Sequence, residues 1–118
     1  MSVAMMRVGE VIRVGPLGSE LKTAQLVTLI KTDALEVFQL IVPVGQCLPT
    51  HELQGEVIVH CLEGRASLTA LGAVRDLKAG EVLYYSSNEP FSVQGIENAS
   101  VLITVALSSP KENNQLIG

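Results

Sequence analysis

Short apolar runs separated by turn residues make up most of the chain. The runs are rich in β-branched residues and lie at 25–32, 34–45, 56–64, 66–72, 81–86, 91–96 and 101–107. Each run has the length and composition of a β-strand. Turn residues at 32–33, 43–49, 63–64, 79–80, 86–90 and 97–98 divide the runs at intervals of about ten residues. No long helical period competes, so the pattern predicts an all-β sandwich or barrel.

Several of these runs are apolar on both alternating faces. Residues 37–42 show this clearly, because Val37, Phe38, Leu40 and Ile41 place apolar side chains on both faces of the strand. A strand with one solvent-exposed face alternates instead between apolar and polar residues. A second sheet of the same subunit can cover one face, and another subunit can cover the other. We therefore expect a homodimer.

The length and composition indicate one domain. The chain has 118 residues, of which 47% are hydrophobic and 17% are charged, so it can bury a substantial core. We expect a single domain, residues 1–118, with its core at about 25–108. Residues 1–24 are expected to form an edge strand and a Gly-Pro turn, a segment that could pair across the dimer. Residues 109–118 form a polar tail.

Charge and aromatic content exclude several kinds of partner. The net charge is −4 and no run of Lys or Arg occurs, which argues against nucleic acid. Two Phe, two Tyr and no Trp supply too few rings for a base-stacking platform. The chain shows no signal-peptide pattern and no stretch of about 18 apolar residues, so we expect a cytoplasmic protein that does not bind membranes.

Two cysteines, Cys47 and Cys61, are too few for a disulfide scaffold and do not form a CxxC pair. We expect both to be buried, reduced thiols. Tyr84 and Tyr85 occupy consecutive strand positions, so one should face the core and the other the surface or a dimer contact.

Arg65 is expected to be a solvated charge at a strand end. Arg75, which follows the 66–72 run, is likewise expected to be a solvated charge at a strand end.

Residues 45–64, GQCLPTHELQGEVIVHCLEG, resemble the first conserved motif of the cupin superfamily. That motif runs Gly, five residues, His-x-His, three or four residues, Glu, six residues, Gly. Gly45, His51 and Gly64 stand at the required positions.

Residues 80–91, GEVLYYSSNEPF, resemble the second cupin motif, which runs Gly, five residues, Pro-x-Gly, two residues, His. Gly80 is in place, and Asn88 stands at a Gly position, where Asn tolerates a left-handed turn. The resemblance implies a single-domain cupin-type double-stranded β-helix, a jelly-roll barrel whose open mouth binds a metal or a small molecule.

The metal-ligand positions of the family are largely replaced in this chain. Only His51 is kept, because Leu53, Val57 and Phe91 stand where the resemblance implies His, Glu and His. A transition metal needs three or four N, O or S ligands. We therefore expect no metal and no cofactor. The resemblance implies instead an apolar pocket for a small molecule, lined by His51, Leu53, Val57, Val59 and Phe91.

Glu56 and His60 are the nearby side chains that are candidates to replace the missing metal ligands. A bulge at Gly55 would turn Glu56 inward, so that any metal would be held by His51 with Glu56. Without a bulge, the strand period of two points Glu56 and His60 to one face and Val57 to the other. The cupin resemblance implies that the face of Val57 is the barrel interior. His60 lies roughly 13 Å along the strand from Glu56 and cannot share an ion with it. We expect His60 to be a half-buried strand or interface residue.

Three function classes follow. The first is a metal-free binding module with little or no catalytic activity, in which His51 supplies the polar contact. The second is an enzyme, either a metal-independent isomerase or lyase that uses His51 as acid or base, or a metal-dependent oxygenase with unorthodox ligands. The third is a structural or regulatory partner that acts through its dimer interface. The ligand count favours the first class, and the fold alone does not decide among them.

Overall fold

Nine β-strands occur in the part of the chain that the structure describes, which in this computed structural model is residues 6–15, 23–49, 55–70, 72–86 and 90–107. They are β1 (Gln25–Lys31), β2 (Leu35–Val42), β3 (Cys47–Pro49), β4 (Gly55–Glu63), β5 (Arg65–Ala70), β6 (Ala73–Lys78), β7 (Val82–Ser86), β8 (Ser92–Gly95) and β9 (Ala99–Leu107). These residues include no helix, and the predicted all-β class is confirmed.

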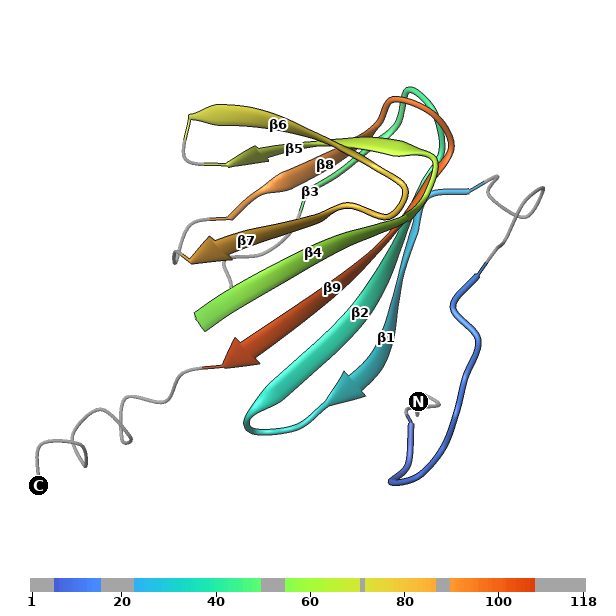
Figure 1. The fold of residues 1–118 in the computed structure, drawn as a ribbon, viewed down its shortest axis with the longest axis vertical. Helices are drawn as coiled ribbons and strands as arrows, with labels where there is room; N and C mark the ends of the chain where they lie inside the picture. The colour runs from blue at the N-terminus through green and yellow to red at the C-terminus, as the bar shows by residue number, and fades with distance from the viewer. Residues whose placement is uncertain (1–5, 16–22, 50–54, 71, 87–89, 108–118) are drawn as a thin grey trace, which may run out of the picture.

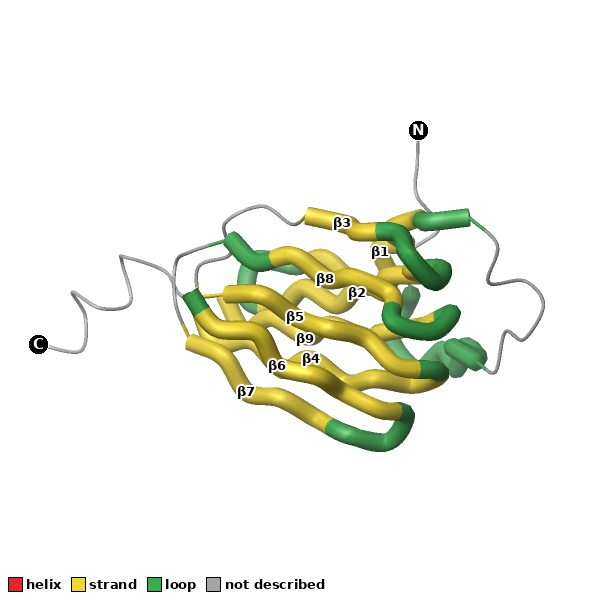
Figure 2. The backbone as a smooth tube through the Cα atoms, turned by 90° about the horizontal axis from the view of Figure 1, so that it is seen from above, coloured by secondary structure: helices red, strands yellow, loops and turns green. Residues whose placement is uncertain are grey.

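The strands form two antiparallel sheets that face each other. One sheet has five strands in the order β1-β2-β9-β4-β7, and the other has four in the order β3-β8-β5-β6. Figure 1 shows the two layers, and Figure 2 shows the four-stranded sheet lying across the five-stranded one. Most neighbouring strands in the two sheets are distant in sequence, as in a jelly roll, and only the pairs β1–β2 and β5–β6 are consecutive. The double-stranded β-helix architecture predicted from the motifs is confirmed.

The core lies between the sheets and follows the strand period of two. Along β4, Val57, Val59 and Cys61 are buried, with at most 1% of each side chain exposed, and the residues between them are not. The same alternation runs along β9, where Val101, Ile103 and Val105 are fully buried. Because opposed residues in antiparallel strands share a face, these two strands supply the centre of the core.

The opening segment differs from the expectation of a strand in residues 1–24. Residues 6–15 contain no strand, and the prediction is wrong for that part. Local hydrogen bonds explain the difference, because the Glu10 amide donates to the Arg7 carbonyl at 3.0 Å and the Arg7 amide donates to the Glu10 carboxylate at 2.9 Å. These bonds close a turn instead of leaving the backbone free for a sheet ladder. The end of the chain, 108–118, lies outside the described residues.

This segment lies against the outer face of its own five-stranded sheet. Gln39 on β2 donates from Nε2 to the Val14 carbonyl at 2.9 Å and to Ser100 Oγ on β9 at 2.7 Å. Gln39 and Ser100 are 6% and 0% exposed although they are polar and outward-facing. The chain's own N-terminal segment therefore covers part of the face for which the sequence predicted another subunit.

Two strands were not predicted, and both are atypical in composition. β3 lies within the stretch interpreted as a turn and ends on Pro49, which sheets tolerate at an edge. β6 is the other edge strand of that sheet and carries Arg75, Asp76 and Lys78. Charged side chains at an edge discourage pairing with another chain. The features that suit these strands to an edge also hide the usual strand pattern.

The motif glycines occupy backbone conformations that favour glycine. Gly45, Gly64 and Gly80 have φ values of 81°, 72° and 92°. At Gly64 a side chain would also collide with the carbonyl of Asn98. The glycine frame of the motifs is thus required by the turns of the barrel, independently of any metal.

Candidate functional site

The structure places three of the five predicted pocket residues in the barrel interior. Val57, Val59 and Phe91 are 0%, 1% and 3% exposed and belong to one core cluster. His51 and Leu53 lie outside the described residues. The described part of the predicted pocket is therefore an apolar surface inside the barrel.

Glu56 lies on the outer face of the five-stranded sheet. It is exposed, and the Tyr84 hydroxyl donates to its Oε1 at 3.0 Å. The pairing of β4 with β7 and β9 is regular at this residue, so no bulge at Gly55 turns it inward. His60 is half-buried on the same face, as predicted. Among the described residues, no three His, Cys, Asp or Glu side chains are grouped closely enough to hold a metal ion.

A cavity of about 340 Å³ opens between β5, β6 and β7. Its lining residues are Leu68, Ala70, Ala73, Arg75, Leu83, Tyr84, Tyr85 and Ser86. None of the three described pocket residues, Val57, Val59 and Phe91, lines this cavity. Residues that do line it pair with or pack against all three. Tyr85 is paired with Val57 and Leu83 with Val59 across β7 and β4. The Tyr85 ring also packs edge-on against the Phe91 ring, with centroids 5.6 Å apart.

Small side chains explain why this region of the interior is not filled. Ala70 and Ala73 are directly opposed at the end of the β5–β6 hairpin. Two methyl groups occupy little of the space that larger residues fill elsewhere in the core. β6 and β7 are also edge strands of their respective sheets, so backbone groups on their free edges are not used in a ladder. The lining thus combines apolar side chains with strand-edge backbone.

Arg75 is placed differently from its predicted role as a solvated charge at a strand end. It stands within β6, directly opposite Leu68, whose side chain is 2% exposed and points into the core. Opposed residues share a sheet face, so Arg75 lies on the inner face at the cavity. The inward position of Arg75 was not predicted, because the apolar pattern does not reveal β6. A hairpin turn at Gly72 would have predicted that Arg75 lies opposite Leu68.

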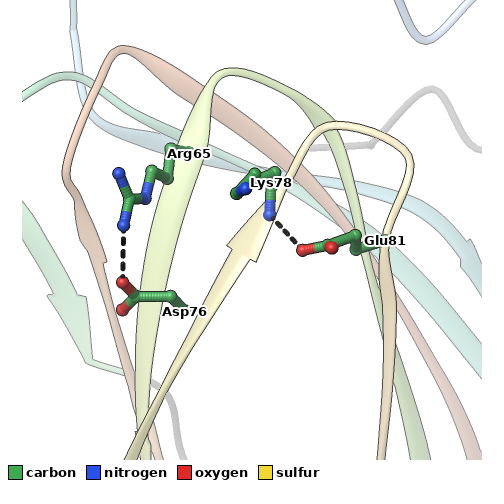
Figure 3. A network of polar contacts seen from close by, with 4 residues as sticks. All are labelled: Arg65, Asp76, Lys78 and Glu81. Atoms are coloured by element: carbon green, nitrogen blue, oxygen red, sulfur yellow. Dashed lines mark hydrogen bonds and ion pairs between the residues drawn. The ribbon is translucent and has the colours of Figure 1, made fainter.

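The outer surface of the same hairpin carries its own polar contacts (Figure 3). Arg65 Nη2 and Asp76 Oδ2 form an exposed ion pair at 3.0 Å. At the turn into β7, the Lys78 amide donates to the Glu81 carboxylate at 2.8 Å. The Gly80 amide also donates to the Cys61 carbonyl at 2.8 Å. These contacts fix β7 beside β6 and so hold two walls of the cavity together.

The two cysteines occupy different environments. Cys61 is fully buried on β4, as predicted, and its Sγ lies 3.5 Å from the Glu63 carbonyl. Burial raises the pKa of the Cys61 thiol, while that hydrogen bond lowers it to a smaller extent. Cys47 is exposed, so the prediction that both thiols are buried is wrong for this residue. Its position on the edge strand β3 accounts for the difference.

Comparison with known proteins gives matches at the level of the fold. No protein-family model matches the chain, and no curated protein matches it. An RmlC-like cupin with a double-stranded β-helix fold from Methanocaldococcus jannaschii superposes with a TM-score of 0.67 at 22% identity, covering 90% of this chain and 99% of that one. The chain has the cupin fold.

Other solved structures agree with this fold, and one of them is named as an enzyme. An RmlC-like cupin from Desulfovibrio desulfuricans matches with a TM-score of 0.64 and 24% identity over 82% of this chain and 90% of that one. A DMSP lyase from Ruegeria pomeroyi matches with a TM-score of 0.63 and 21% identity over 80% of this chain and 52% of that one. The cupin barrel therefore leaves the activity open. Within the described residues, no helix has the length and apolar character needed to cross a membrane.

Proposed function

We propose that this cupin barrel is a small-molecule-binding module with an apolar pocket and no conventional metal site. The observation that carries the proposal is the cavity of about 340 Å³ between β5, β6 and β7. Its volume lies at the lower end of the range of about 300–1,000 Å³ that ligand sites occupy. Leu68, Leu83 and Tyr85 supply apolar walls, as small-molecule pockets usually have.

The proposed pocket joins this cavity to the residues expected from the cupin motifs. Val57 and Phe91 adjoin Tyr85, which forms a wall of the cavity. We propose that they form the inner end of the site and that His51 and Leu53 contribute at its rim. In this arrangement His51 offers the ligand a polar contact.

The absence of a conventional metal site is proposed from the chemistry of the side chains. Val57 and Phe91 stand at two ligand positions of the family and carry no N, O or S donor on their side chains. Glu56, the nearest carboxylate in sequence, is exposed on the other face and hydrogen-bonded to Tyr84. A single imidazole does not hold a divalent transition metal against water.

Ligand titration tests the binding proposal directly. The amide spectrum of the isotope-labelled protein would be followed during titration with hexanamide, a neutral probe with a short apolar body. We expect saturable shifts at cavity residues such as Leu83 and Tyr85, and loss of these shifts in Ala73→Leu, which fills the space. Val74→Leu is the matched control, because Val74 points outward from the same strand and is 63% exposed. Equal shifts in parent and Ala73→Leu would contradict this site.

Elemental analysis tests the metal proposal. The protein would be purified without an affinity tag, supplied with Ni, Zn, Mn and Fe, dialysed and analysed beside His51→Ala. We expect well under one equivalent of metal in both. Near-stoichiometric metal that vanishes in His51→Ala would overturn the proposal and favour the enzyme class, such as an oxygenase with unorthodox ligands.

We also propose that the protein is a homodimer that pairs through the outer face of the five-stranded sheet. Ile58, Val82 and Tyr84 lie together on β4 and β7 and are 45%, 58% and 62% exposed. Contiguous exposed apolar side chains of this kind are typical of an interaction surface. Light scattering should give twice the chain mass of 12.6 kDa for the parent and 12.6 kDa for Ile58→Lys. A monomeric parent at micromolar concentration would exclude the dimer.

A further inference from the structure

We infer that the ligand of this barrel is a small carboxylate with an apolar body, and that Arg75 binds its carboxylate group at the cavity. The inference rests on the proposed function, because it names the ligand class of the same site. It follows from one permanently charged side chain on the inner face of a cavity whose other described side chains are uncharged.

The register fixes the direction of Arg75. β6 pairs with β5 so that Ala73, Arg75 and Leu77 oppose inward-facing residues, and Leu77 itself is 4% exposed in the core. Arg75 stands between a cavity-lining alanine and a core leucine on one face of the strand. It remains solvent-exposed, since β6 is the edge of its sheet. Arg75 thus lines the cavity and is also accessible to water.

The charge of Arg75 has no partner among the described residues. Arg65, on the same hairpin but on the outer face, pairs with Asp76 at 3.0 Å. No comparable ion pair or hydrogen bond occurs for Arg75 within residues 6–15, 23–49, 55–70, 72–86 and 90–107. An arginine presents a planar set of donors that fits a carboxylate with two parallel hydrogen bonds. Arg75 is therefore available to a ligand anion.

The other walls define the rest of the ligand. Leu68, Leu83 and Tyr85 form apolar surface, and Ala70 and Ala73 leave the space between them. Such walls suit a short hydrocarbon or an aromatic ring. At about 340 Å³ the cavity takes a small molecule and not a long chain. A charge at one end and an apolar body at the other together describe a small monocarboxylate.

A carboxylate fits this site better than a phosphate group. Phosphate carries more charge and is usually bound by several donors, such as the backbone amides of a helix N-terminus or a glycine-rich loop. The described residues contain no helix, and Arg75 is the only cation that lines the cavity. The net charge of −4 further disfavours a polyanion. One guanidinium group matches one carboxylate.

Calorimetric titration with hexanoate and hexanamide tests the inference, because the two probes share a hydrocarbon body and differ in charge. We expect hexanoate to bind the parent at least tenfold more tightly than hexanamide, and its affinity to fall with added salt. Arg75→Gln should lower hexanoate affinity about tenfold and leave hexanamide affinity unchanged. A tenfold change is about 1.4 kcal/mol, within the range of a charge-assisted hydrogen bond.

Two control variants sharpen the test. Lys78→Gln removes the same charge from the outer face of β6 and should leave hexanoate affinity at the parent value. Arg75→Lys keeps the charge but loses the paired donors, so it should bind hexanoate with intermediate affinity. Equal binding of the two probes, or unchanged hexanoate binding in Arg75→Gln, would overturn the carboxylate inference alone. If neither probe binds the parent, the proposed binding function fails as well.

Discussion

The two halves of the barrel interior are packed in different ways. In the half formed by the inner faces of β4 and β9, called here the packed half, Val57, Val59 and Ile103 are at most 1% exposed. In the half around β5, β6 and β7, called here the open half, the paired residues Ala70 and Ala73 lie side by side on one wall of a cavity of about 340 Å³. Both halves belong to one jelly roll, but β4 and β9 have 9 residues each, whereas β5, β6 and β7 have 6, 6 and 5.

The residues of the packed half stabilise the fold, whereas those of the open half leave the cavity of the proposed binding site. Branched side chains interdigitate across β4 and β9 and specify one arrangement of the sheets. Alanines and a charged edge residue contribute little to such packing, so their presence in the open half is not explained by stability. The glycine frame of the motifs belongs to the fold, whereas the binding chemistry that we propose belongs to a few side chains on β6 and β7.

The largest effect should follow from truncation in the packed half. Ile103→Ala removes a fully buried side chain from the central strand and leaves a void, so we expect the free energy of unfolding to fall by about 2–5 kcal/mol. Leu83→Ala should cost less, because Leu83 is partly buried and already borders empty space. Urea unfolding of both variants measures the difference. Equal losses would show that the two halves are packed alike.

Replacing an alanine with leucine should change stability by a smaller amount, and the direction of the change should differ between the two halves. Ala66→Leu adds bulk beside Leu77 in filled space, because Ala66 is 1% exposed, and should destabilise the protein by about 1–3 kcal/mol. Ala73→Leu puts the same side chain into the cavity and should leave stability unchanged or slightly raised. Thermal unfolding compares the two variants. A large loss of stability in Ala73→Leu would show that the cavity is not free space.

Much of the packed half could be predicted from the sequence. The period of two placed Glu56 on one face of the 56–64 run and Val57 and Val59 on the other. The cupin resemblance assigned the second face to the barrel interior, and the burial along β4 agrees. The motif spacing also indicated the cupin barrel. Tyr84 and Tyr85 also divide between surface and core as predicted, with 62% and 7% of their side chains exposed.

The open half was harder to predict, because its key strand has no apolar pattern. β6 mixes Val74 on the outer face with Arg75 on the inner face, so neither face reads as the core side. Its placement depends on pairing with β5, which only the hairpin turn at Gly72 fixes. The cavity itself lies between the alanines of this hairpin and β7 of the other sheet, an arrangement of two sheets that no local pattern contains. His51 and Leu53 stay predictions, because they lie outside the described residues.

The smallest effect should be a dependence of stability on pH that arises in the packed half. Burial raises the pKa of Cys61 above its ordinary value of 9.0. Below that pH both the folded and unfolded thiols are neutral, and the stabilisation from burying this group is complete. As the pH rises further, the unfolded thiol loses its proton while the folded one keeps it, so the free energy of unfolding should fall.

Urea unfolding at pH 8 and pH 10 isolates this contribution when the parent is compared with Cys61→Val, because other groups titrate equally in both. We expect the parent to lose more stability than Cys61→Val over this interval. Cys47→Ser serves as the control and should behave like the parent, since Cys47 is exposed on β3. If Cys61→Val and the parent lose the same stability, water reaches β4 and the packed half is less tightly closed than its burial indicates.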